Sequence, residues 1–217
     1  MIRRAILIIF RPESTWQTIA LARSPQPITH HLAPLTLLPA GVAALLTLMP
    51  GDYIPTALLS PLPADSAFGL ALHEYWAHLQ IPLSPAARHT SAALALFTAA
   101  LAYAGIWAMI LAGAVVLDLL LPLFSAPRDL RRATMVVAYS ATPLLLSSVA
   151  LLSTALVPVV ALAAMHACYI AYLGLPILLK VPREEAGVCV ALSVVGSLIV
   201  GQVAGYSVGA LRSLLTG

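Results

Sequence analysis

The stretch that decides the fold is MVVAYSATPLLLSSVALL (Met135–Leu152) followed by VVALAAMHACYIAYLGLPILL (Val159–Leu179). Neither segment contains Asp, Glu, Lys or Arg, and each is close to the roughly 20 residues that cross a bilayer core. A short uncharged turn at Pro158 separates them, and cations bracket the pair: Arg128, Arg131 and Arg132 before it, Lys180 and Arg183 after it. The pattern predicts a membrane hairpin with both open ends on one side of the bilayer.

The composition of the whole chain agrees with this interpretation. Of 217 residues, 61% are hydrophobic and 9% are charged, so the apolar surface is too large for one soluble core. The net charge of +3 comes from cations scattered at the ends of apolar runs, which is not the pattern of a nucleic-acid surface. We therefore expect an all-α integral membrane protein that forms a single domain over residues 1–217 and binds no nucleic acid.

Three further apolar runs complete the predicted bundle. Five spans are expected in total, at about residues 32–49, 92–117, 135–152, 159–179 and 187–211. Pro34 and Pro39 predict a kink in the first span. The one long connection, residues 50–91, joins the first two spans.

Two amphipathic helices are predicted to lie on the membrane surface. The first begins near Pro12 and carries Trp16, which is expected at headgroup depth. The second lies in the connection, where apolar residues from Phe68 to Leu79 recur on one helical face. These helices would flank the spans without crossing the bilayer.

The distribution of cations predicts the orientation. If the N-terminus is cytoplasmic, nine Lys and Arg residues lie inside and two, Arg88 and Arg212, lie outside. The absence of Asn and the preference for Arg over Lys hint at a bacterial source. We therefore expect a bacterial cytoplasmic (inner) membrane protein with its C-terminus in the periplasm.

The order of residues in the hairpin resembles a known family. It runs from Arg132 through Ala138-Tyr139-Ser140-Ala141-Thr142-Pro143 and Pro158 to Leu173-Gly174-Leu175 and Lys180-Val181-Pro182. This is similar to the Ypt-interacting protein (Yip) family, particularly its bacterial members, and the resemblance implies five spans with a cytoplasmic N-terminus. Eukaryotic members engage Rab-type GTPases through a long N-terminal region. Because only about thirty residues precede the first span here, a Rab-type partner is not expected.

Several polar residues inside the spans are candidates for function. Pro143 frees a backbone carbonyl near Tyr139, so neighbouring hydroxyls or another helix must satisfy the backbone. Tyr139, Ser140 and Thr142 therefore predict a kinked packing node; the alternative is a small cytoplasmic pocket that these hydroxyls form with Asp118 and Lys180. His166 lies in the middle of its span, where it either hydrogen-bonds a neighbouring helix or transfers protons. Asp118 either pairs with a cation or holds an ion or proton.

The last span carries a regular stripe of small residues, which are Ser193, Ser197, Gly201, Gly205 and Gly209. Small side chains let helix backbones approach closely in lipid. The stripe predicts a tight contact with another span, with a partner protein or with a second copy of the chain.

Motifs for catalysis or metal binding are not found. His73 and His78 flank Glu74, but a spacing of five puts the two histidines on different helical faces. We expect no enzyme activity, cofactor or metal. The sequence favours a scaffold, membrane-organising factor or accessory subunit in contact with the bilayer and other membrane proteins. The alternative is a small transporter in which Asp118, His166 and Tyr139 line a polar path.

Overall fold

The computed structural model describes residues 2–21, 28–48, 92–153 and 156–216, with the side chains of the last helix described as far as Gln202. Apart from short connections, these residues are helical, and five helical segments are long and apolar enough to cross a membrane. They are Ile28–Leu46, Ala95–Phe124, Leu130–Leu152, Pro158–Leu179 and Arg183–Gln202. The prediction of an all-α, five-span membrane protein is therefore confirmed.

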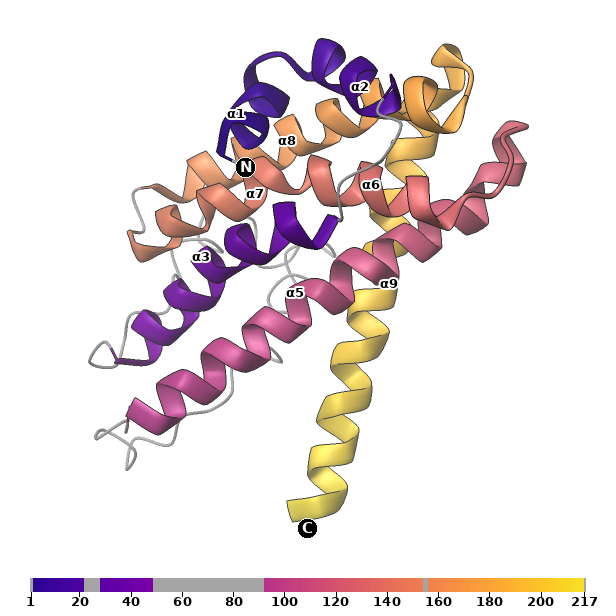
Figure 1. Cartoon of the computed structure of the whole chain (residues 1–217). Helices are drawn as coiled ribbons and strands as arrows, with labels where there is room; N and C mark the ends of the chain where they lie inside the picture. The colour runs from indigo at the N-terminus through magenta and orange to yellow at the C-terminus, as the bar shows by residue number, and fades with distance from the viewer. Residues whose placement is uncertain (1, 22–27, 49–91, 154–155, 217) are drawn as a thin grey trace.

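The two helices at the N-terminus lie outside this set of spans. α1 (Ile2–Phe10) and α2 (Pro12–Leu21) are separated at Arg11 and pack together over the hairpin (Figure 1). Pro12 begins α2, where its missing N–H removes no helical hydrogen bond, and Glu13 follows in the positive first turn. The short segments of chain before the first span are thus packed on the bundle.

The first two spans lie side by side. α3 (Ile28–Leu48) contains both Pro34 and Pro39, and it begins four residues earlier than the sequence predicts. It packs along α5 (Ala92–Leu120), which continues into the 3₁₀ turn η3 (Leu121–Phe124) (Figure 1). The connection between them is outside the described residues, and so are its predicted surface helix and the histidines at 73, 78 and 89.

The hairpin forms as predicted, although its first arm is broken. α6 (Leu130–Ser140) and α7 (Thr142–Ser147) meet at Ala141, and the arm ends in the 3₁₀ segment η4 (Ser148–Leu152). The break follows from Pro143, which has no N–H to donate to the carbonyl of Tyr139. The second arm is α8 (Val157–Gly174), and it ends in the π-helical turn η6 (Leu175–Leu179).

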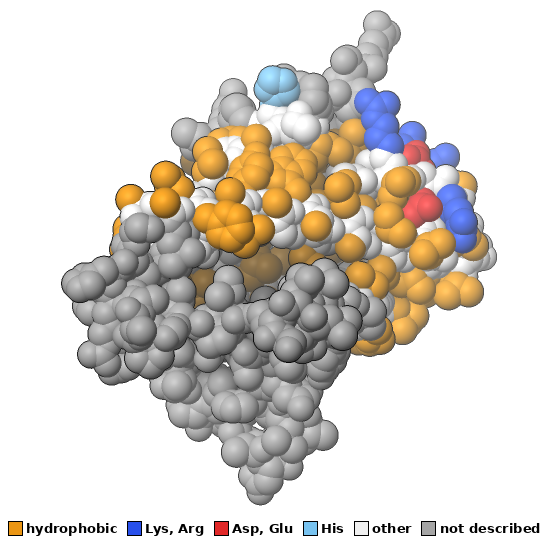
Figure 2. All heavy atoms as spheres, turned by 90° about the horizontal axis from the view of Figure 1, so that it is seen from below, with side chains coloured by type: hydrophobic (Ala, Val, Ile, Leu, Met, Phe, Trp, Pro, Cys, Tyr) orange, Lys and Arg blue, Asp and Glu red, His pale blue; other side chains and the backbone are white. Residues whose placement is uncertain are grey.

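The buried core is centred on the hairpin. Half of an apolar 18-residue stretch in the Leu130–Leu152 span is buried, against 28% of the corresponding stretch in each of the three other spans that precede the last helix. The main cluster combines side chains of the hairpin with Ile8 and Trp16 from the N-terminal helices and Leu117 and Leu121 from the second span. Elsewhere the outer faces of the spans are apolar and exposed, as expected for surfaces that face lipid (Figure 2).

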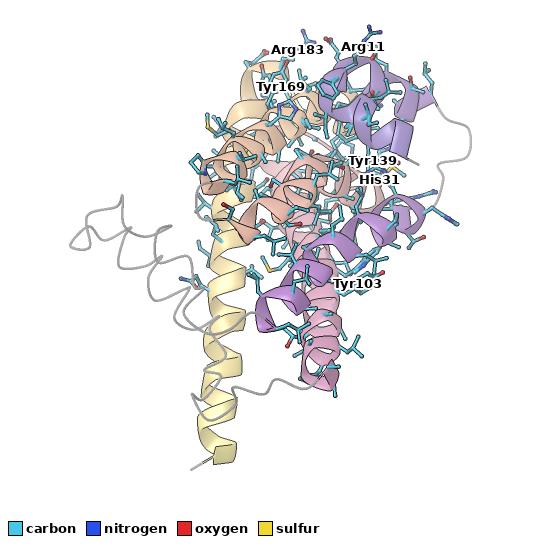
Figure 3. All side chains as sticks on the ribbon, turned by 90° about the vertical axis from the view of Figure 1, so that its left-hand side faces the viewer. Arg11, His31, Tyr103, Tyr139, Tyr169 and Arg183 are labelled. Carbon is cyan, nitrogen blue, oxygen red and sulfur yellow. The ribbon has the colours of Figure 1, made fainter. Side chains whose placement is uncertain are left out.

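The last helix, α9 (Arg183–Thr216), crosses α5, and their far ends separate (Figures 1 and 3). Glycines permit the close crossing. A Cβ atom at Gly196 would lie 2.7 Å from Val116 Cγ1, and one at Gly113 would lie 3.4 Å from Ser197 Oγ. Below this point, a Cβ atom at Gly201 would lie 3.3 Å from Met109 Cε. The close packing of the two helices therefore extends from Gly196 to Gly201 on α9.

Replacing Gly196 by Ala tests this crossing. The added methyl would overlap Val116 Cγ1, so either this side chain or the helices must shift, and overpacking of this kind costs about 1–3 kcal/mol. Gly187 on the same helix has nothing within 4 Å of its Cβ position, so Gly187→Ala is a matched control that should keep or raise stability. Thermal unfolding in detergent should show a lower midpoint for Gly196→Ala only, and Val116→Ala should restore it. Equal midpoints for the two glycine variants would contradict the packing.

Candidate functional site

Trp16 connects the N-terminal helices to the hairpin. Its indole is fully buried, and Nε1 donates a hydrogen bond to the Ile170 carbonyl at 3.0 Å. The ring occupies the space above Gly174, where a Cβ atom would lie only 2.7 Å from Trp16 Cε2. It also meets Tyr139 edge to face, with ring centroids 5.8 Å apart and an interplanar angle of 82°. Trp16 therefore fits a notch that exists because residue 174 has no side chain.

His31 connects the first span to the same region. Its Nε2 and the Thr142 Oγ1 are 3.1 Å apart, and both side chains are buried. The imidazole also packs on Tyr139, with ring centroids 4.4 Å apart (Figure 3). Together Trp16, His31, Tyr139 and Thr142 form a polar node that joins α2, α3 and the break between α6 and α7.

The environment of Trp16 differs from the sequence-based expectation. The sequence puts this residue at headgroup depth, but the structure encloses its side chain within protein. A helix that is apolar on one face can rest that face on lipid or on another helix, and local periodicity does not separate the two. Here the partner is α8, and no surface of the indole remains for headgroups.

His166 makes a second connection between the N-terminal helices and α8. Its Nε2 lies 3.0 Å from the carbonyl oxygen of Ile9, at the end of α1. A third contact lies at the start of the last helix, where Arg183 Nη2 and Glu13 Oε1 are 3.2 Å apart on the surface. The N-terminal helices thus follow the hairpin from the middle of α8 to the beginning of α9.

The other predicted polar residues are placed separately from this node. Lys180 is exposed at the connection between α8 and α9, whereas Tyr139 and Thr142 are buried under Trp16 and His31. Asp118 Oδ1 and Ser140 Oγ are buried and have no hydrogen-bond partner in the described part of the chain. No carboxylate–cation contact within 4.0 Å involves Asp118 there.

The stripe of small residues divides into two parts. Ser193 Oγ donates a hydrogen bond to the Cys189 carbonyl, and Ser197 Oγ donates one to the Ser193 carbonyl, both at 2.7 Å. Both hydroxyls therefore bond to backbone carbonyls of their own helix. Ser197 and Gly201 face α5, as described above. Gly205 and Gly209 lie beyond the described side chains.

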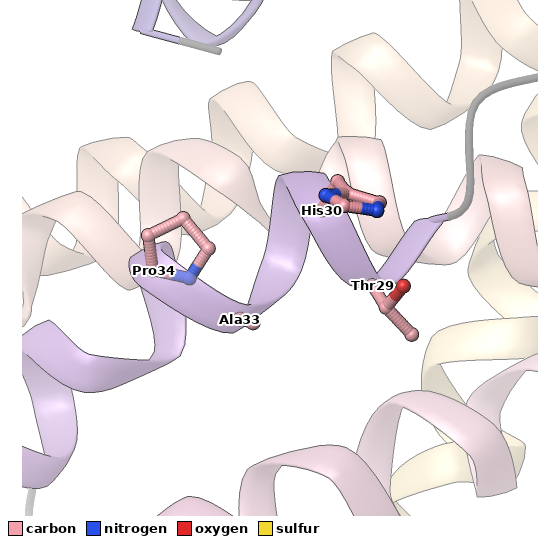
Figure 4. Close-up of a pocket in the computed structure, with 4 residues that line it drawn as sticks. All are labelled: Thr29, His30, Ala33 and Pro34. Carbon is pink, nitrogen blue, oxygen red and sulfur yellow. The ribbon is translucent and has the colours of Figure 1, made fainter.

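No metal site is found among the described residues. Among them, no three His, Cys, Asp or Glu side chains are grouped so as to hold a metal ion. One open depression of about 340 Å³ is lined by Thr29, His30, Ala33 and Pro34, all from the first turns of α3 (Figure 4). Four side chains from a single helix do not converge on a ligand.

Sequence reasoning missed His31, which is a member of the node, and the role of Gly174, on which the Trp16 ring packs. His31 stands next to a proline-containing linker, and nothing nearby in the sequence indicates a partner 111 residues away. Gly174 falls in an apolar run, where a glycine has many roles. One sequence signal could have identified Gly174. A single Trp before the first span and a glycine in the hairpin together suggest that the aromatic ring packs against the backbone at the glycine.

Comparison with known proteins identifies one family. The family model described as the Yip1 domain matches residues 6–205. No curated protein and no solved structure matches the chain. The matched range includes the whole polar node and the crossing of α5 and α9.

Replacing Thr142 by Val tests whether the node holds helices together. The change preserves shape but removes the hydroxyl that bonds His31, so we expect a loss of about 0.6 kcal/mol, the average for side-chain hydrogen bonds between membrane helices. Thr18→Val is the matched control, because that exposed hydroxyl bonds only the Ser14 carbonyl of its own helix. The measurement is unfolding in detergent with and without His31→Phe. If the losses of stability in the two single variants add up to the loss in the double variant, the Thr142 and His31 side chains are not energetically coupled.

Proposed function

The chain belongs to the Yip1 domain family, and from this membership and its contacts we propose that it is a non-enzymatic scaffold, membrane-organising factor or accessory subunit of a membrane complex. We further propose that residues 1–217 form one multi-pass membrane domain. The observation that carries the proposal is that polar side chains within the bundle form hydrogen bonds between its helices.

Most polar groups near the hairpin already have partners in other helices. Trp16 bonds Ile170, His31 bonds Thr142, and His166 bonds Ile9, so each of these groups joins two elements. A transport path requires polar groups that face a shared cavity and exchange partners with a substrate. These contacts support a structural role for the node in preference to a path through it.

The exposed surface of the last span supports a role in which the chain binds a partner protein. Only 11% of the residues of Arg183–Gln202 are buried, compared with 50% in Leu130–Leu152. Beyond the face packed on α5, it presents exposed apolar side chains, which include Val188, Leu192, Val195, Leu198 and Ile199. We propose that this face contacts another membrane protein or a second copy of the chain, in addition to lipid.

The charge distribution supports a cytoplasmic N-terminus. The connections from α5 to α6 and from α8 to α9 share one end of the bundle, and Figure 2 shows Lys and Arg side chains, with acidic side chains among them, gathered at one end of a largely apolar face. Since such residues are enriched on the cytoplasmic side, we propose that this end is cytoplasmic and that the C-terminus is periplasmic, in the inner membrane of a bacterium.

Affinity purification in mild detergent tests the scaffold proposal. We expect the chain to elute as a defined complex, and Val195→Ala/Leu198→Ala/Ile199→Ala should release the partner. The control is Leu162→Ala/Met165→Ala, which trims exposed apolar side chains of α8 and should leave the complex intact. A monomer that moves a solute across vesicles, with flux lost in Asp118→Asn, would favour the transporter instead.

Reporter fusions test the orientation. Alkaline phosphatase folds only when exported, so we expect activity when it follows Gly217 and none when it precedes Met1, because the cations hold their end of the bundle inside. Expression of each fusion is checked by immunoblot. The opposite pattern of activity would reverse the proposed topology.

A further inference from the structure

Two helix connections that are far apart in the sequence meet at the cationic end of the bundle. Arg132 Nη1 donates a hydrogen bond to the Leu178 carbonyl at 3.1 Å, which fixes the start of α6 against the π-helical end of α8. Arg132 Nε also pairs with Asp129 Oδ2 at 3.2 Å, and Asp129 Oδ1 caps α6 by accepting the Arg132 N–H. Arg132 and Asp129 are therefore occupied in holding the two connections together.

Three cations on these two connections have no carboxylate partner in the described part of the chain. Arg128, Arg131 and Lys180 are exposed, and within the described ranges no Asp or Glu oxygen lies within 4.0 Å of their charged nitrogens. Asp129 lies between Arg128 and Arg131 in the sequence, but it is held by Arg132. Glu184 and Glu185, the acids nearest to Lys180 along the chain, occupy the first turn of α9, where the helix dipole favours negative charge. The three cations come from both sides of the Arg132–Leu178 contact.

The backbone at Lys180 gives an independent reason to assign a role to its side chain. This residue has φ 59° and ψ 25°, the left-handed conformation that ends η6. Glycine adopts this conformation without steric cost, whereas a lysine does not. A lysine at such a position points to a function for the ammonium group that the turn itself does not need.

Exposed apolar side chains lie on the elements that adjoin the two connections. Leu123 is 72% exposed, Leu130 is 48% exposed and Val188 is 56% exposed, and they lie on η3, α6 and α9 beside the two connections. Cations at the edge of an apolar belt meet both the phosphate and the acyl chains of a lipid. A free phosphate ion would gain nothing from the leucines.

We propose that Arg128, Arg131 and Lys180 form a binding site for the phosphate headgroup of an anionic phospholipid. The guanidinium groups offer paired N–H donors to phosphate oxygens, and the ammonium adds a point charge. Basic pockets between membrane helices on one side of the bilayer bind anionic headgroups in this way. The inference concerns this end of the bundle and holds whether or not the last span has a protein partner.

Lys180→Gly separates binding from folding. Glycine fits the left-handed turn, so the variant should fold at least as well as the parent in phosphatidylcholine, yet it removes the ammonium. We expect about fivefold weaker binding of phosphatidylglycerol, measured by native mass spectrometry of the full chain and by the lipid-induced shift in thermal midpoint. Arg131→Gln should act similarly, and Lys180→Arg should retain binding.

Arg11→Gln is the control for charge alone, because it removes one exposed cation at the junction of α1 and α2 and should leave lipid binding unchanged. Equal binding of phosphatidylglycerol and phosphatidylcholine by the parent chain would overturn the proposal. So would an equal loss in Arg11→Gln and Lys180→Gly, which would indicate a diffuse charge effect. Protection by inorganic phosphate alone, to the same extent as by lipid, would identify a phosphate-ion site and reject the lipid.

Discussion

The indole of Trp16 reaches the Ile170 carbonyl because residue 174 has no side chain. A Cβ atom at that position would lie too close to the ring, so this glycine determines how closely the indole approaches α8. With the ring in this position, the Ile9 carbonyl lies within hydrogen-bond distance of His166, and Glu13 pairs with Arg183. The position of the N-terminal helices along α8 therefore depends on this single close approach.

The break in the hairpin contributes the other half of the node. A proline inside a membrane helix leaves a carbonyl without its helical donor, and the cost is tolerable only where neighbours cover the irregular backbone. Tyr139 and Thr142 flank this break and are covered by Trp16 and His31. Burial of the break by α2 and α3 explains why the most irregular span is also the most buried one.

The spans could be predicted from sequence because the bilayer imposes a strong local rule: long uncharged runs must be helices that satisfy their own backbone. The hairpin followed from two such runs and a short turn. The partners of Trp16 and His31 could not be predicted, because they lie 154 and 111 residues away and no local pattern encodes them. The same limit applies to Arg132, which reads as a topology signal but also bonds Leu178 across the bundle. The distribution of charges predicts on which side of the membrane such a residue lies, but only the packed structure identifies its hydrogen-bond partner.

The unsatisfied polar atoms bear on the choice between scaffold and transporter. Trp107 Nε1, Asp118 Oδ1 and Ser140 Oγ are buried without partners in the described part of the chain, and they lie on α5 and α6. A polar path would therefore have to follow the contact between these two helices and bypass His166, whose ring nitrogen is bound to Ile9. Asp118 is less than two turns from Phe124 at the cationic end of α5, yet within the described ranges no cationic nitrogen lies within 4.0 Å of its carboxylate. The residues proposed for a path are thus divided between two sites, and the one at His166 is already used to hold the N-terminal helices in place.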